Sequence, residues 1–90
     1  MKHAGPTALA RLEGLLTALR GRPGLIERRS GVFYRGGQAF LHFHEDPAGL
    51  FADFRPGEAW ERWPVTDEAQ RARLIAAIDR ALALERQSGA

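Results

Sequence analysis

The sequence predicts an α+β fold in which an antiparallel sheet of three to four strands carries the N- and C-terminal helices on one face. Three observations lead to this prediction. Apolar residues recur every three to four positions at both ends of the chain. Between residues 25 and 65 the period changes to two. Glycine and proline separate these alternating stretches, as they do between antiparallel strands.

Length and composition predict one domain that covers residues 1–90. A chain of 90 residues buries one modest core, and 44% hydrophobic residues are too many for a disordered chain. The absence of cysteine excludes a disulfide framework, a thiolate metal site and a cysteine nucleophile. No stretch approaches the roughly 20 apolar residues of a membrane span, and no signal peptide is recognisable. We therefore expect a cytoplasmic protein without a membrane partner, frayed at residues 1–5 and 87–90.

The first predicted element is an amphipathic helix over residues 6–20. Pro6 suits its first turn, where the missing N–H is not needed, and Gly21 followed by Pro23 suits its end. Its apolar face consists of leucines three and four positions apart, namely Leu9, Leu12, Leu16 and Leu19, with Leu15 beside them.

Four alternating stretches follow, and each predicts a strand. They are LIERRSGVFY (25–34), which is one strand or a kinked pair, QAFLHFH (38–44), GLFADFR (49–55) and AWERWPV (59–65). Two glycines at 36 and 37 suit a tight hairpin turn, and the next two connections contain proline and glycine.

The last predicted element is a helix over residues 67–86. Thr66 or Asp67 can cap its first turn, and an acidic pair there complements the positive end of the helix dipole. Its apolar face consists of Leu74, Ile75, Ile78, Ala81 and Leu82.

The two hairpin turns predict which side chains share a face of the sheet. A tight first turn places Phe33 opposite Phe40, and the next turn places His42 opposite Asp53. The face that receives the helices then carries Val32, Tyr34, Ala39, Leu41, Phe43, Leu50, Ala52 and Phe54. The other face carries the candidate ligand or interface residues Phe33, Phe40, His42, His44, Phe51, Asp53 and Arg55.

This second face predicts the function, because phenylalanines around a few polar groups are typical of a ligand pocket or the centre of an interface. The phenylalanines would give apolar contact, His42 and Asp53 a hydrogen-bonding pair, and Arg55 an anion contact. Trp60 or Trp63 would wall the site. We expect a small binding or protein-interaction module, homodimeric because a second copy would cover the aromatic face, with a small ligand or another protein as the alternative partner.

Other interpretations of the two histidines remain open. His42 could simply bond Asp53 across the strands while His44 rests on Phe51. Alternatively, His42 and His44 are candidate metal ligands, because residues i and i+2 of a strand point the same way. A third ligand would then come from Asp53, Glu45 or Asp46.

A metal-dependent enzyme using His42 and His44 is therefore one alternative function, although no nucleophile or phosphate-binding loop is recognisable. We expect neither catalytic residues nor a cofactor. A nucleic-acid-binding protein is another alternative, since the formal net charge is +2 and a basic segment could contact phosphates. That segment consists of Arg20, Arg22, Arg28, Arg29 and Arg35.

The stretches PGLIERR and GVFYRGGQAFLHFHED, followed by a tryptophan-containing strand and a terminal helix, give the chain a familiar pattern. Over about residues 23 to 83 it resembles the small bacterial luciferase-domain family of uncharacterised proteins. Its layout around one sheet also resembles the MmcQ/YjbR-like α+β proteins, which are described as DNA-binding-like. The first resemblance implies an α+β fold in a bacterial protein without establishing light-producing chemistry. The second raises the nucleic-acid alternative, and neither supplies catalytic residues.

Overall fold

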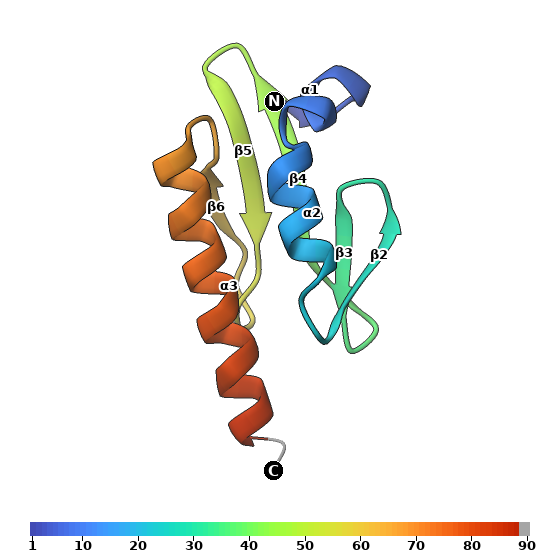
Figure 1. Ribbon diagram of the computed structural model, residues 1–90, viewed down its shortest axis with the longest axis vertical. Helices are drawn as coiled ribbons and strands as arrows, with labels where there is room; N and C mark the ends of the chain where they lie inside the picture. The colour runs from blue at the N-terminus through green and yellow to red at the C-terminus, as the bar shows by residue number, and fades with distance from the viewer. Residues whose placement is uncertain (89–90) are drawn as a thin grey trace.

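The computed structural model describes the backbone of residues 1–88 and the side chains of residues 1–84, and it confirms an α+β fold with one antiparallel sheet. Within these residues there are six strands and three helices, more than the predicted three to four strands and two helices. In chain order they are β1 (Lys2–His3), α1 (Pro6–Arg11), α2 (Glu13–Arg20), β2 (Leu25–Arg29), β3 (Val32–Arg35), β4 (Gln38–Asp46), β5 (Gly49–Phe54), β6 (Glu61–Pro64) and α3 (Glu68–Ser88) (Figure 1).

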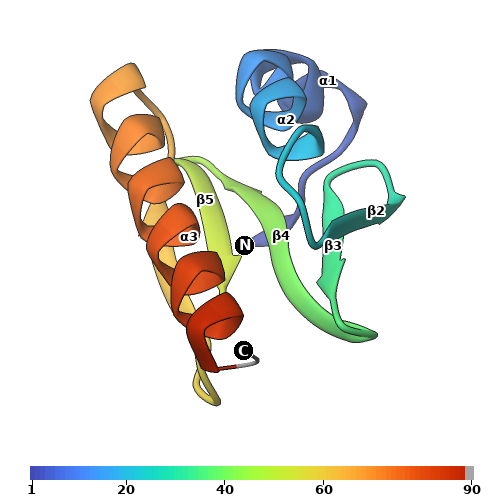
Figure 2. The ribbon, with the colours of Figure 1, turned by 60° about the horizontal axis from the view of Figure 1, so that its bottom comes forward.

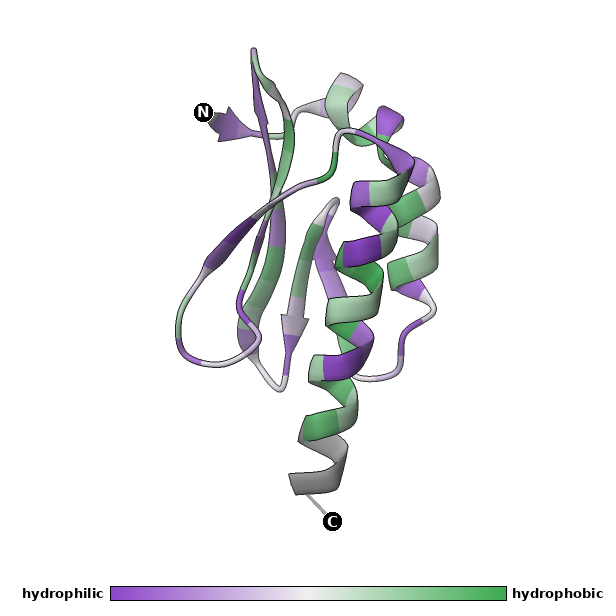
Figure 3. Cartoon of the chain, turned by 90° about the vertical axis from the view of Figure 1, so that its left-hand side faces the viewer, coloured by the Kyte–Doolittle hydropathy of each residue, from purple (hydrophilic) through white to green (hydrophobic). Residues whose placement is uncertain are grey.

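The molecule has two layers, with the helices on one face of the sheet (Figure 3). Figure 2 shows α2 and α3 side by side above that face. The core between the layers draws on both helical ends of the chain and on the middle strands. Its largest fully buried side chains are Phe33, Phe40, Phe54, Leu12, Leu16, Leu19, Leu41, Leu74, Ile78 and Val65.

The predicted N-terminal helix is interrupted at Leu12. The backbone of this residue has φ −97° and ψ 7°, outside helical geometry, so that α1 ends before it and α2 begins after it. Leu12 is fully buried. Because the break turns the axis of the helix, leucines before and after it can pack on different parts of the same sheet. Periodicity alone predicted one helix, since both halves keep the same apolar spacing.

The stretch 25–34 is a kinked pair, as one of the two readings of the sequence allowed, and it forms the hairpin β2–β3. Gly31 in the turn has φ 77°, a conformation that side chains rarely adopt. A Cβ atom at this position would also lie 2.7 Å from Cδ2 of Leu9 on α1. Glycine is therefore required both by the turn and by the close approach of α1.

The strands are ordered β2-β3-β4-β5-β6, and β1 pairs with β4 beside this path. The long strand β4 is central. Along one edge it pairs first with β3 and then with β1, and along the other edge with β5. Residues 2 and 3, which were expected to fray, therefore extend the sheet.

A β-bulge in β4 corrects the predicted register of the first hairpin. Tyr34 lies opposite Ala39 as predicted, but Phe33 lies opposite Leu41 instead of Phe40. Phe40 is the extra residue of the bulge, and a bulge of this kind turns the chain so that a side chain changes face. Phe33 and Phe40 are 0% and 1% exposed, which makes them core residues and contradicts their predicted place on the second face.

The register shift moves three other residues in the opposite direction. Val32, Tyr34 and Ala39 were predicted to face the helices, but their partners and the alternation of β3 place them on the far side. By contrast, the predicted pairing of β4 with β5 is confirmed, including His42 opposite Asp53 and His44 opposite Phe51. The buried positions predicted on these two strands are confirmed at Leu41, Phe43, Leu50, Ala52 and Phe54.

A reciprocal cap begins α3. Asp67 Oδ1 accepts a hydrogen bond from the Gln70 N–H at 2.8 Å, and Gln70 Oε1 accepts from the N–H groups of Thr66 and Asp67. This is a capping box with glutamine in the fourth position. No helix among the described residues is long and apolar enough to cross a membrane.

Candidate functional site

The sheet face opposite the helices, called the open face below, carries two short rows of side chains across the strands. Cross-strand pairs place one row over β1, β4, β5 and β6, consisting of His3, His44, Phe51 and Pro64. The next row runs over β3, β4, β5 and β6 and consists of Val32, His42, Asp53 and Arg62. Alternation along β4 and β5 thus brings the predicted histidines and Asp53 together, as the sequence indicated.

All three histidines of the chain meet on this face. Each offers one ring nitrogen, and the three nitrogens lie within 4.8 Å of one another. Nδ1 of His42 and Nε2 of His44 are 3.0 Å apart. The ring of His3 stacks on that of His44 with 4.7 Å between the centroids. His3 was not predicted as a site residue, and it reaches the site only because β1 pairs with the end of β4.

Asp53 is held from both sides. Arg62 donates two hydrogen bonds to its carboxylate, at 2.8 and 2.9 Å, and Nε2 of His44 lies 2.9 Å from Oδ2. The Arg62 hydrogen bond lowers the pKa of Asp53, so the carboxylate stays ionised at neutral pH. The predicted partner of Asp53 was His42, its direct cross-strand neighbour. The contact within hydrogen-bond distance is made instead by His44, the diagonal neighbour.

His42 lies between His44 and a tryptophan wall. The ring centroid of Trp60 is 4.9 Å from that of His42, and the Arg55 guanidinium lies 4.9 Å above the Trp60 ring. Partial burial and the neighbouring His44 lower the pKa of His42, so its imidazole is neutral at pH 7. Of the two predicted wall residues, Trp60 therefore takes this role. Trp63 packs edge-to-face on Phe54 in the core layer.

The ring of His44 is almost enclosed, with 12% of its side chain exposed. Its Nδ1 is buried and has no hydrogen-bond partner. Among the side chains that the structure describes, this is the one buried nitrogen or oxygen atom without such a partner. A buried polar atom left unpaired costs about 1 to 3 kcal/mol and needs an explanation.

The remaining predicted candidates lie outside the histidine cluster. Arg55 contacts Trp60 and donates a hydrogen bond to the carbonyl oxygen of Ala39. Glu45 points to the helix side, where it accepts from the Gly5 N–H at 2.7 Å. Asp46 follows His44 by two residues and therefore lies on the open face, but its carboxylate accepts from the Ala48 N–H within the turn.

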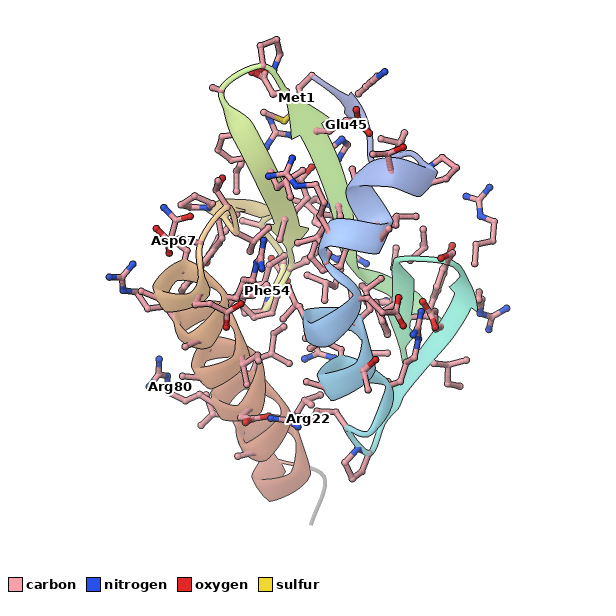
Figure 4. The ribbon with its side chains drawn as sticks, turned by 45° about the horizontal axis from the view of Figure 1, so that its top comes forward. Met1, Arg22, Glu45, Phe54, Asp67 and Arg80 are labelled. Atoms are coloured by element: carbon pink, nitrogen blue, oxygen red, sulfur yellow. The ribbon has the colours of Figure 1, made fainter. Side chains whose placement is uncertain are left out.

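A hollow of about 500 Å³ lies at the end of the sheet beside β1. Figure 4 shows Met1 and Glu45 close together there. The lining residues are Met1, Lys2, Glu45, Asp46 and Pro47. Its lining thus includes Met1 and Lys2, which directly precede His3 in the chain.

The basic segment 20–35 is largely paired within the molecule. Arg20 binds Glu13 and Glu27, and Arg22 binds Asp79 on α3. Two other arginines lie over aromatic rings, Arg28 over Tyr34 and Arg35 over Phe40. Four of the five arginines predicted to contact phosphate therefore already have a partner within the molecule.

Comparison with known proteins gives no assignment, because no family model, curated protein or solved structure matches this chain. The resemblance to the luciferase-domain and MmcQ/YjbR-like families stays a prediction from sequence. The arrangement on the open face can offer imidazole nitrogens, one ionised carboxylate and an aromatic wall to a small ligand or ion.

Proposed function

We propose that this protein is a small ligand-binding module that holds its ligand on the open face. One observation carries the proposal. His42, His44 and Asp53 converge in a half-buried network on the face of the sheet that the helices leave uncovered. Convergent polar groups beside an aromatic wall are what a small-ligand site requires.

A purely structural role explains this network poorly. Cross-strand pairs contribute at most about 1 kcal/mol, and β-branched or aromatic pairs would provide as much without burying polar atoms. Here one buried nitrogen of His44 is left without a partner. Local arrangements that cost stability are typical of functional sites, where a ligand supplies the missing interaction.

Two earlier expectations lose part of their support. The homodimer was predicted from three phenylalanines on one face, and Phe33 and Phe40 lie in the core instead. Phe51 remains on the open face. Self-association therefore stays a prediction that one of the three phenylalanines still supports. The nucleic-acid alternative loses support because Arg20 and Arg22 are neutralised by carboxylates and two further arginines are packed on rings.

Amide chemical shifts of ¹⁵N-labelled protein provide the test. The untagged protein is titrated with small carboxylates, phosphates, amines, sugars and divalent cations, each separately. We expect at least one class to shift the amides of β4, β5 and β6 around His42 and Asp53. The variant Asp53→Asn should change that binding about 10-fold or more, weakening it for an amine or divalent cation and strengthening it for a carboxylate or phosphate, because it removes a negative charge from the site.

Arg29→Gln is the matched control, since it removes a charge from the basic segment and should leave this binding unchanged. The proposal is overturned if no class shifts the open face. It is also overturned if the shifts map to residues 20–35 and duplex DNA binds there in a salt-sensitive manner that Arg29→Gln weakens.

A further inference from the structure

His3 lies far from the other two histidines in the sequence and joins them through the topology of the sheet. His42 and His44 point the same way from β4, and the pairing of β1 with β4 places His3 directly opposite His44, 41 residues later in the chain. The Ala4 N–H donates to the Phe43 carbonyl oxygen at 3.0 Å and continues this pairing. All three histidines of the sequence therefore lie close together on the open face.

The closest pair of ring nitrogens already has the separation that one bound ion would impose. Zinc–nitrogen bonds of about 2.0–2.1 Å at angles between 90° and 109° hold two nitrogens about 2.9 to 3.4 Å apart. Nδ1 of His42 and Nε2 of His44 are 3.0 Å apart. The three nitrogens lie within 4.8 Å of one another, so a move of His3 inward by about 1 to 2 Å would bring it to bonding distance of the same ion. Its exposed side chain has room to do so.

Hydrogen bonding alone does not satisfy this cluster. A neutral imidazole has one N–H, yet Nε2 of His44 lies within 3.0 Å of both His42 Nδ1 and Asp53 Oδ2. If that N–H is on Nε2, the buried Nδ1 keeps an unpaired lone pair. If it is on Nδ1, the Nε2 lone pair faces the Asp53 carboxylate. A cation bound at Nε2 removes the second conflict, because the lone pair that faces the carboxylate then binds the ion.

We propose that His3, His42 and His44 bind one divalent transition-metal ion, with Asp53 as the carboxylate that completes the ligand set. This inference rests on the proposed function, since it names the ligand of the same open face. Three imidazoles suit Zn²⁺, Co²⁺, Ni²⁺ or Cu²⁺. The lack of cysteine and the single adjacent carboxylate disfavour Cu⁺, Mg²⁺ and Ca²⁺.

Asp53 would act through its position. Its Oδ2 lies 2.9 Å from Nε2 of His44, the nitrogen that also faces His42 Nδ1, so an ion bound there has the carboxylate beside it as a further ligand. Asp53 is itself fixed by the two hydrogen bonds from Arg62, and 15% of its side chain is exposed. The Arg62 side chain is half exposed and can retain these bonds while the metal binds on the histidine side.

Calorimetric titration of untagged, chelator-treated protein with ZnCl₂ at pH 7.5 tests the inference. We expect one ion per chain with a Kd of about 1 μM or below. His42→Ala and His44→Ala should each weaken binding about 100-fold, and His3→Ala and Asp53→Asn about 10- to 100-fold. Co²⁺ should give visible absorption bands of the intensity expected for four- or five-coordinate nitrogen ligation. Circular dichroism verifies that each variant is folded, and His42→Gln and His44→Gln replace any alanine variant that is not.

Lys2→Ala is the matched control, because Lys2 lies on the same short strand and pairs with Glu45 on the other side of it. It should change the Kd less than about threefold. Absence of binding below 100 μM, a measured affinity that survives both His42→Ala and His44→Ala, or equal losses in Lys2→Ala and His3→Ala would overturn the inference. If Zn²⁺ fails while an organic ligand still shifts open-face amides, the metal inference falls and the proposed function stands.

Discussion

At the scale of single residues, Phe40 shows how one inserted position decides which side chains form the core. It is the extra residue of the β4 bulge, 1% exposed, and packs edge-to-face on Phe54 with 5.3 Å between the ring centroids. Phe40→Ala should therefore lower the free energy of unfolding by about 3 to 5 kcal/mol, because it removes a fully buried ring and leaves a cavity. Urea unfolding followed by circular dichroism measures this loss.

Phe51→Ala is the comparison, since Phe51 lies on the open face and is only partly buried. It should cost about 1 to 2 kcal/mol, less than the core residue. Equal losses for the two variants would contradict the bulge. Phe40→Asp, which would separate a dimer without unfolding it if Phe40 lay on an interface, should instead unfold the protein, because it places a charge in the core.

At the scale of elements, Glu27 links α2, β2 and the following turn. Its carboxylate accepts hydrogen bonds from Arg20 at 2.6 Å and from the Gly31 N–H at 2.9 Å, and the Arg20 bond lowers its pKa below the ordinary value of 4.5. A carboxylate with a lowered folded-state pKa stabilises the fold above its unfolded-state pKa and loses that contribution as the pH falls. Glu27→Gln should therefore destabilise the protein at pH 7 and have little effect at pH 3.

Urea unfolding of wild type and Glu27→Gln at pH 7, 5, 4 and 3 measures this difference. Glu58→Gln is the control, because Glu58 is exposed in the β5–β6 loop and should change stability little at any of these values. A gap between wild type and Glu27→Gln that stays constant down to pH 3 would rule out the linkage.

Elements with a long repeated signal were predictable. The helix predicted over residues 67–86 is confirmed as α3 (Glu68–Ser88) with its Asp67 cap. The β4–β5 register is confirmed as well, because proline and glycine between these strands fix a short turn. The break at Leu12 and the bulge at Phe40 were not predictable, since the apolar spacing on either side of each is compatible with regular structure. Both are decided by how helices and sheet pack.

Only part of the candidate site was predictable from the sequence. Alternation along β4 and β5 was enough to place His42, His44 and Asp53 on one face. His3 and Arg62 could not be assigned to it. β1 is two residues long, too short for a periodic signal, and its pairing with β4 depends on the whole chain returning to that edge. From the sequence alone, Arg62 looks like any exposed charged residue, because its partner on the neighbouring strand is not yet known.

At the scale of the whole molecule, a metal ion on the three histidines would tie the start of the chain to its middle. An ion that binds only the folded state, present at 100 times its Kd, adds about 2.7 kcal/mol of stability. For a domain of 60 to 100 residues each kcal/mol raises Tm by about 4 to 8 °C, so the expected rise is about 10 to 20 °C. Differential scanning calorimetry with and without Zn²⁺ measures it.

The same ion should slow hydrogen exchange of the Ala4 amide, which donates to Phe43 immediately after His3. Exchange at this position reports opening of β1, because the neighbouring pairs Lys2–Glu45 and His3–His44 end the sheet there. In His3→Ala, Zn²⁺ should still raise Tm through His42 and His44, but by less, and the protection of Ala4 should disappear. Lys2→Ala should retain both effects. If Zn²⁺ raised Tm fully in His3→Ala, the metal would be bound by β4 alone and the N-terminal strand would not be coupled to the site.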